Sequence, residues 1–124
     1  MPGWSIRARS ARGERNPLSV ARDPDILASH LEDAAHFPGG HTPGLVAPSS
    51  EAEVAEALRS CPAVLAIGAQ SSLTGGATPQ GEILLSTARM NRILEVGTDS
   101  VRVEAGVTLT DLDLRLQQKG CHYP

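Results

Sequence analysis

The sequence predicts an α+β fold, with a small strand-helix-strand subdomain followed by the start of a second, mainly antiparallel sheet. An unbroken apolar run at residues 63–67 predicts a buried strand, and a helical pattern over residues 50–61 precedes it. A further apolar segment at 45–47 comes before both, so residues 45–67 are expected to form a strand-helix-strand unit. The continuous run suits a parallel strand covered on both faces. Alternating apolar and charged residues over 101–105 are instead typical of a half-buried strand.

The first helix is predicted to begin at Asp23-Pro24 and to run to about Ala35. Asp23 suits the cap, and Pro24 suits the first helical position because its missing N–H would be unpaired there anyway. Residues 36–43, rich in Gly and Pro, predict a turn region. Residues 1–22 hold five arginines against one acid. We expect a disordered Arg-rich leader there, with a targeting peptide or an anion-binding arm as the alternatives.

The second helix is introduced by Ser50 and Glu53, which have the spacing of a capping box. Pro62 is expected to end this helix, because proline lacks the N–H that a helix interior needs. The face predicted to pack on the sheet holds Val54, Ala57, Leu58 and Cys61.

Three further strands are predicted near residues 82–86, 93–96 and 101–105. In the last of these the valines and Ala105 are expected to face inward, and Arg102 and Glu104 outward.

A last helix is predicted from Thr108, which can cap it, to a stop at Gly120. The inward face of this helix is expected to hold Leu109, Leu112 and Leu116.

The loop at residues 68–76, which reads Gly-Ala-Gln-Ser-Ser-Leu-Thr-Gly-Gly, follows the predicted strand at 63–67. Its small residues let several backbone N–H groups converge on one point, and converging N–H groups bind phosphate. The loop has neither a Gly-Lys-Ser/Thr ending nor a Gly-x-Gly-x-x-Gly pattern. A phosphate would therefore be held by the backbone and by Ser71, Ser72 and Thr74. Composition alone fits a flexible surface connection equally well.

Four segments carry a family resemblance in a fixed order: 46–54, 68–76, 89–96 and 101–107. With these, residues 23–124 resemble FAD-linked oxidoreductases of the vanillyl-alcohol oxidase type, which have an FAD-binding PCMH-type domain. The branch that they resemble most contains glycolate oxidase and D-lactate dehydrogenase. On this resemblance the chain is the first part of such a domain, and it is incomplete.

The resemblance implies that the loop wraps the FAD pyrophosphate. Two positions depart from the family pattern: Ile67 stands where an arginine is common, and Gln70 where a second glycine is common. Gln70 adds a side-chain amide donor. Val107 and Thr108 are expected near the flavin, and FAD is expected to bind non-covalently because the loop contains no histidine. The residues expected to bind the cofactor are Gly68, Ala69, Gln70, Ser71, Ser72, Leu73, Thr74 and Gly75.

The implied reaction is hydride transfer from a 2-hydroxy acid or related alcohol to FAD, so the expected partners are FAD and a small hydroxy acid. The substrate domain of such enzymes is missing, so we name no catalytic residue and expect the chain alone to be inactive. The alternative is a truncated, non-catalytic fragment or binding module.

Composition argues against several other classes of function. A net charge of −3, with one Trp, one Tyr and one Phe, argues against nucleic-acid binding. No apolar run is long enough for a transmembrane helix. Two distant cysteines, Cys61 and Cys121, form no disulfide framework, and a cytoplasmic location is expected. No metal is expected, because no metal-ligand spacing links His30, His36, His41 and His122.

Overall fold

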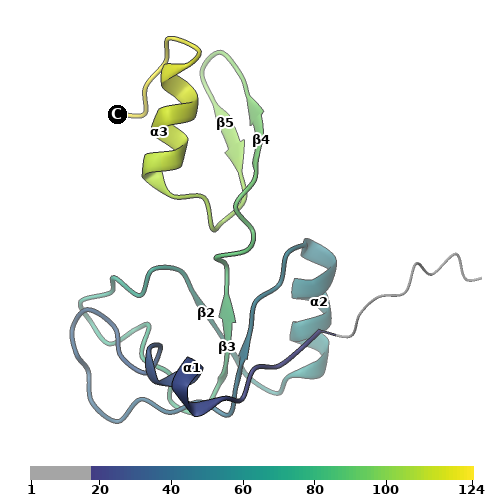
Figure 1. Ribbon diagram of the computed structural model, residues 1–124, viewed down its shortest axis with the longest axis vertical. Helices are drawn as coiled ribbons and strands as arrows, with labels where there is room; N and C mark the ends of the chain where they lie inside the picture. Colours follow the sequence, from purple (N-terminus) through teal and green to yellow (C-terminus); the bar gives the residue numbers. More distant parts are fainter. Residues whose placement is uncertain (1–17) are drawn as a thin grey trace, which may run out of the picture.

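The computed structural model describes residues 18–124, which form two parts joined by the segment after β3 (Figure 1). The first part contains α1 (Pro24–Ala28), β1 (Leu45–Val46), α2 (Glu51–Ser60), β2 (Val64–Ile67) and β3 (Ile83–Ser86). The second part contains β4 (Ile93–Val96), β5 (Val101–Val103) and α3 (Leu109–Gln117). The predicted order of helices and strands and the α+β class are confirmed.

The sheet of the first part is parallel and has the order β1-β3-β2. β3 is the central strand, with Leu84 opposite Leu45 on one side and Leu65 on the other. All four residues of β3 are buried, whereas β2 is an edge strand with Ala66 exposed. The parallel prediction is right, but the strand covered on both faces is β3 and not the run at 63–67.

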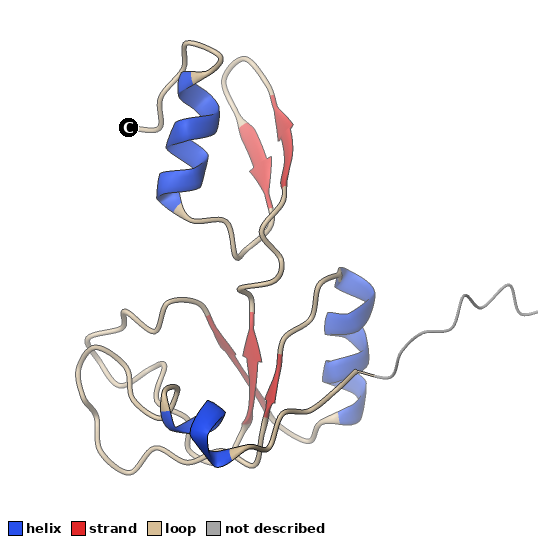
Figure 2. Ribbon diagram, in the orientation of Figure 1, coloured by secondary structure: helices blue, strands red, loops and turns tan. Residues whose placement is uncertain are grey.

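The two helices of the first part cover opposite faces of this sheet (Figure 2). Leu27 of α1 packs with Leu84 in a cluster completed by Leu45 and Ile67. Ala57 of α2 belongs to the cluster on the other face, with Val46, Ile83 and Leu85. β3 therefore contributes side chains to both halves of an aliphatic core.

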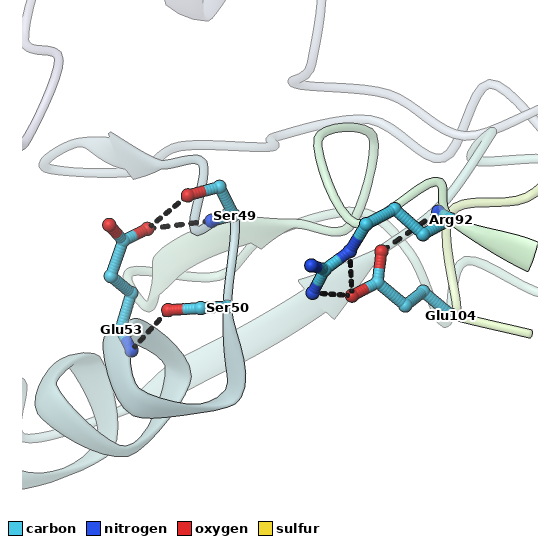
Figure 3. Close-up of polar contacts among 5 residues, drawn as sticks. All are labelled: Ser49, Ser50, Glu53, Arg92 and Glu104. Carbon is cyan, nitrogen blue, oxygen red and sulfur yellow. Dashed lines mark hydrogen bonds and ion pairs between the residues drawn. The ribbon is translucent and has the colours of Figure 1, made fainter. Parts of the chain in front are cut away.

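The start of α2 shows how its cap forms (Figure 3). The Ser50 hydroxyl accepts a hydrogen bond from the Glu53 N–H at 3.2 Å, as the capping-box pattern predicts. The Glu53 carboxylate binds Ser49 instead of Ser50, accepting from its N–H at 2.6 Å and from its hydroxyl at 3.0 Å. These bonds from Ser49 lower the pKa of Glu53, and the bond from the N–H has the larger effect.

Leu58 was expected in the packed face of α2 but is 59% exposed, because the buried stripe of the helix centres on Ala57.

α1 is much shorter than predicted, since it ends at Ala28 rather than near Ala35. The Ser29 hydroxyl donates to the Ile26 carbonyl at 3.0 Å, and the next residues turn away to bind the loop after β2. Those tertiary hydrogen bonds replace the helical ones that residues 30–35 would otherwise form.

The Arg-rich leader predicted over residues 1–22 lies mostly outside the described residues. Its last residues belong to the fold: Ala21 and Leu45 exchange two backbone hydrogen bonds of 2.8 and 2.9 Å. Leu18 and Val20 pack on the core next to α2. Among the described residues, Leu18 to Arg22 therefore pack with the part of the chain that begins at residue 23.

The second part pairs β4 with β5 in an antiparallel ladder that shifts register between Ile93 and Glu95. β5 ends at Val103, and the next residue turns its side chain inward. Glu104 is therefore buried and Ala105 exposed, the reverse of the predicted alternation.

α3 begins as predicted, since the Thr108 hydroxyl accepts from the Asp111 N–H at 3.1 Å. Gly120 has a φ of +70°, which suits the predicted stop. Leu112 and Leu116 are buried, but Leu109 is 69% exposed, so the predicted inward face is wrong at its first position.

The longest helix in residues 18–124 is α2 with ten residues, and none of the helices described combines the length and apolarity of a membrane span.

Candidate functional site

The glycine-containing loop, residues 68–76, leaves the carboxyl end of β2. Ligands of open parallel sheets bind at this edge. The neighbouring strand ends at the same place, where Thr87 donates from its N–H to the Ile67 carbonyl at 3.1 Å. The eight residues expected to bind the cofactor, Gly68 to Gly75, therefore lie together in one loop at the edge where the sequence places them.

The first half of this loop offers a run of unused backbone donors. Within residues 18–124, the N–H groups from Ala69 to Leu73 donate to no protein acceptor. Gln70 has a φ of +50°, the left-handed conformation that favours glycine. A left-handed residue within a run of free N–H groups is the backbone pattern from which anion-binding concavities are built. Glycine adopts this conformation without strain, in keeping with the glycine that the family resemblance led us to expect at this position.

The Gln70 side chain does not face this concavity. Its amide nitrogen donates to the carbonyls of His30 and Ala77, both at 2.9 Å. Both amide hydrogens are thereby used to close the base of the loop. The expected extra donor is therefore a structural tie.

The hydroxyl groups of the loop divide into two kinds. Ser72 and Thr74 bind each other, with their oxygens 3.2 Å apart, and Ser72 also accepts from the Thr74 N–H. Ser71 is exposed beside the free N–H groups. Leu73 is 77% exposed and adds no packing to the first part.

Gly75 has a steric role. Its φ is +79°, and a Cβ there would lie 2.9 Å from the ring of Phe37. A side chain at this position would therefore be strained and would also push against Phe37. Gly68 carries no such restriction, since a Cβ there would meet only the Thr87 hydroxyl at 4.0 Å.

Asp33 is the residue that the sequence analysis missed, because it falls inside the helix predicted to Ala35. Its side chain is 3% exposed, and Oδ1 accepts from the Ala35 N–H at 3.1 Å. Burial pushes the pKa of Asp33 upward, but the Ser72 hydroxyl and the N–H groups of Ala35, Ala77 and Gly75 together hold the pKa below its usual value. Of these donors only Ala35 forms a hydrogen bond of good geometry, and Oδ2 has no such partner among the described residues. The direction of the pKa shift therefore reflects nearby dipoles more than complete hydrogen bonds.

The second part of the molecule meets this edge of the sheet at Gly106. The Gly106 N–H donates to the Met90 carbonyl at 2.8 Å, and a Cβ on Gly106 would overlap the Thr87 carbonyl. Thr87 therefore touches both the end of β2 and the segment leading to Val107 and Thr108. The Thr108 hydroxyl is committed to its helix, because it donates to Asp111 Oδ2 at 2.7 Å.

Three hollows in the described residues lie elsewhere. One of about 500 Å³ is lined by the β4–β5 turn and the C-terminal residues, and another of about 500 Å³ by the start of α2, β4 and β5. A third, of about 330 Å³, lies beside Ala47, Glu53 and Arg89. None of these three hollows is lined by residues 68–76. Residues 18–124 contain no group of three or more His, Cys, Asp or Glu side chains placed to hold a metal.

The chain is similar to known proteins over most of its length. A model of the FAD binding domain family matches residues 42–124. An uncharacterised FAD-linked oxidoreductase of Mycobacterium tuberculosis is 39% identical over 83 residues, which are 61% of this chain and 18% of that protein. The mitochondrial D-2-hydroxyglutarate dehydrogenase of Bos taurus is 33% identical over 115 residues, covering 87% of this chain and 21% of that protein.

Among solved structures, an alkyldihydroxyacetonephosphate synthase has a similar fold, with a TM-score of 0.65 at 18% identity. The similarity covers 82% of this chain and 24% of that one. The chain spans about a fifth of the length of the curated relatives that it matches.

Proposed function

Because the chain belongs to the FAD-binding domain family, with FAD as its cofactor, we propose that its loop at 68–75 holds the FAD pyrophosphate. The observation that carries this proposal is the run of free N–H groups from Ala69 to Leu73 around the left-handed Gln70. A diphosphate offers several oxygens, each of which can accept from such donors. Hydrogen bonds from N–H groups to a charged oxygen are shorter and stronger than neutral ones.

The fit with FAD comes from the backbone and needs no cation. The small residues of the loop let a bulky phosphate approach, and Ser71 adds an exposed hydroxyl donor. The proposed site comprises Gly68, Ala69, Gln70, Ser71, Ser72, Leu73, Thr74 and Gly75, with Gln70 acting through its backbone. We propose non-covalent binding, since the loop contains no histidine to which flavin could be attached.

The flavin end of the cofactor is proposed to lie toward Val107 and Thr108. Support comes from the close contact of Gly106 with Thr87, which follows β3 at the carboxyl edge of the sheet. Val107 and Thr108 come directly after Gly106 and therefore lie near this edge. Their role would be to orient the cofactor and to exclude water from one side of it.

For the full-length proteins that the chain resembles, we propose oxidation of a 2-hydroxy acid or a related alcohol. Bound FAD supplies the redox chemistry by accepting hydride, and the protein supplies binding and orientation. The similarity to a D-2-hydroxyglutarate dehydrogenase supports this substrate class. We propose no catalytic residue within these 124 residues and expect the chain alone to be inactive. A cytoplasmic location is also proposed, and the two free thiols, Cys61 and Cys121, are consistent with it.

The test is an FAD titration of the chain and of its Ser71→Asp variant, followed by fluorescence. The added carboxylate would lie beside a phosphate and displace at least one donor. Each lost hydrogen bond to a charged group costs roughly 1.5–3 kcal/mol, so affinity should fall roughly ten- to a hundredfold. Ser100→Asp is the matched control, because Ser100 lies exposed in the β4–β5 turn. Equal affinity of Ser71→Asp and Ser100→Asp would show that the loop is not the phosphate site.

A further inference from the structure

A buried carboxylate, that of Asp33, belongs to a segment that is hydrogen-bonded to the base of the glycine-containing loop. We propose that Asp33 is a positioning residue that holds the second half of the loop, so that the first half keeps its N–H groups directed at phosphate. This inference rests on the proposed function, because it explains how the proposed phosphate site keeps its shape.

The segment that carries Asp33 is tied to both ends of the loop. At the loop's start, the Ala34 N–H donates to the Gln70 carbonyl at 3.0 Å, and the Gln70 amide donates to the His30 carbonyl. At its end, the Thr78 hydroxyl accepts from the Asp33 N–H at 3.3 Å. Residues 30–35 therefore form a backbone clamp across the base of the loop.

The Asp33 side chain enters the space that this clamp encloses. It is 3% exposed and forms no salt bridge among the described residues, so nearby dipoles alone must offset the cost of burying its charge. The Ser72 hydroxyl and the N–H groups of Gly75 and Ala77 lie near enough to lower its pKa, but the carboxylate's one hydrogen bond of good geometry comes from the Ala35 N–H. Its Oδ2 atom is buried without a hydrogen bond of good geometry, which makes it the acceptor that these donors can reach with a small movement.

This arrangement divides the loop between two anions. Ser72, Gly75 and Ala77 lie near the internal carboxylate, and the N–H groups of Ala69 to Leu73 remain available for an external phosphate. Gly75 is fixed on the inner side by its positive φ and by Phe37. Ser72 and Gly75 thus contribute to FAD binding through the shape of the loop.

The direction in which Asp33→Asn changes FAD affinity distinguishes a positioning role from a purely electrostatic one. A carboxylate close to the FAD phosphates repels them, so if Asp33 were only a nearby charge, Asp33→Asn would strengthen FAD binding. If Asp33 holds the loop, Asp33→Asn weakens FAD binding despite the lost repulsion. The amide has one acceptor oxygen in place of two and brings an NH₂ group toward donors.

The experiment compares residue-level amide exchange and FAD affinity in the wild-type chain and in Asp33→Asn. We expect faster exchange at residues 69–77 in the FAD-free variant, unchanged exchange in β3, and FAD affinity lower by about tenfold, as for the loss of one hydrogen bond to a charged group. Glu53→Gln is the matched control, since it also replaces a carboxylate that accepts from a backbone N–H. It should affect only the start of α2 and leave FAD affinity unchanged.

Thr78→Val is the second variant, for the case that Asp33→Asn fails to fold. It removes the hydroxyl that accepts from the Asp33 N–H and should speed exchange in the same residues. Unchanged loop exchange in both variants, or tighter FAD binding by Asp33→Asn, would overturn the inference. Because the exchange measurement needs no FAD, loss of the proposed phosphate site would appear separately, as no effect of FAD on the wild-type loop.

Discussion

Glu104 and Arg92 hold each other through both side chains and backbone (Figure 3). Glu104 Oε1 accepts from Arg92 Nε at 2.9 Å, and Oε2 accepts from the Arg92 N–H at 2.8 Å. The Glu104 N–H in turn donates to the Arg92 carbonyl at 2.9 Å. The pair joins the residue before β4 to the residue after β5, so it closes the open end of the β4–β5 hairpin.

Replacing Glu104 with Gln should loosen the second part selectively. The amide cannot accept from both the Arg92 side chain and its N–H as the carboxylate does. We expect a lower melting temperature and faster amide exchange at residues 92–106, with β3 unaffected. Glu95→Gln is the control, because the Glu95 pair with Arg102, at 3.5 Å, is exposed on both sides. Equal effects of the two substitutions would mean that the hydrogen bonds between Glu104 and Arg92 add no stability beyond that of an exposed ion pair.

The chain should lose stability in acid because of four carboxyl groups. Hydrogen bonds lower the pKa values of Glu53, Glu82 and Glu104, and surrounding donors outweigh burial in lowering that of Asp33. The folded chain therefore binds fewer protons than the unfolded chain. Stability is fully present above the ordinary values of 3.8 for Asp and 4.5 for Glu, and it is lost as pH falls through the lower folded values.

Urea unfolding between about pH 7 and pH 3 measures this loss. Glu104→Gln should make the free energy of unfolding fall less steeply below pH 4.5, because one carboxyl group with a lowered pKa is removed. A free energy of unfolding that stays constant down to pH 3, or rises, would contradict the assigned directions.

Shortening a buried side chain of the central strand β3 should lower the stability of the chain strongly. Leu84 is buried in β3 between the two helix-covered faces, so Leu84→Ala should lower the free energy of unfolding by about 2–5 kcal/mol. Leu73→Ala is the matched control, since the exposed Leu73 should change stability by less than about 0.5 kcal/mol. Chemical denaturation measures both, and similar costs would show that the core does not centre on β3.

Substitutions at Gly75 and Gly39 distinguish the cost of backbone strain at positive φ from the cost of steric overlap. Both have positive φ, +79° and +83°, but a Cβ on Gly39 meets nothing within 4 Å, whereas one on Gly75 meets Phe37. Gly39→Ala should cost about 1–2 kcal/mol for the left-handed conformation alone. Gly75→Ala should cost about 1–3 kcal/mol more, for the overlap. If thermal unfolding gives equal losses, Phe37 does not restrict the loop.

The second part should be the less stable one. A two-stranded sheet is marginal without further cover, and Leu94, Leu109 and Leu114 are each more than half exposed. We expect amide exchange in residues 93–117 to be faster than in β1 to β3, measured by mass spectrometry. Uniformly slow exchange up to Gln117 in a monomer would contradict this expectation.

The local features of the fold could be predicted because neighbouring residues determine them. The caps at Ser50 and Thr108, the stop at Gly120 and the strands at 83–86 and 93–96 follow from sequence patterns within a few residues. The insertion of β3 between β1 and β2 could not be predicted this way, because the pairing of Leu84 with Leu45 and Leu65 depends on contacts between distant segments.

The position of the loop at 68–76 was predictable, but the contacts within it were not. The glycines and small residues mark the loop, whereas the use of the Gln70 amide depends on His30, forty positions away. Asp33 stayed hidden because it falls inside the first predicted helix, which the sequence extended to Ala35. The tertiary bonds from Ala34 to Gln70 and from Asp33 to Thr78 replace the helical ones there. A buried acid among polar neighbours leaves no local pattern in the sequence.

The most direct test of the phosphate site is a titration of the isotopically labelled chain with FAD, followed through its backbone amide resonances. The account predicts the largest shifts at Ala69 to Leu73, reproduced by ADP and absent with riboflavin, which lacks phosphate. Shifts confined to other segments, or equal shifts with riboflavin, would contradict it.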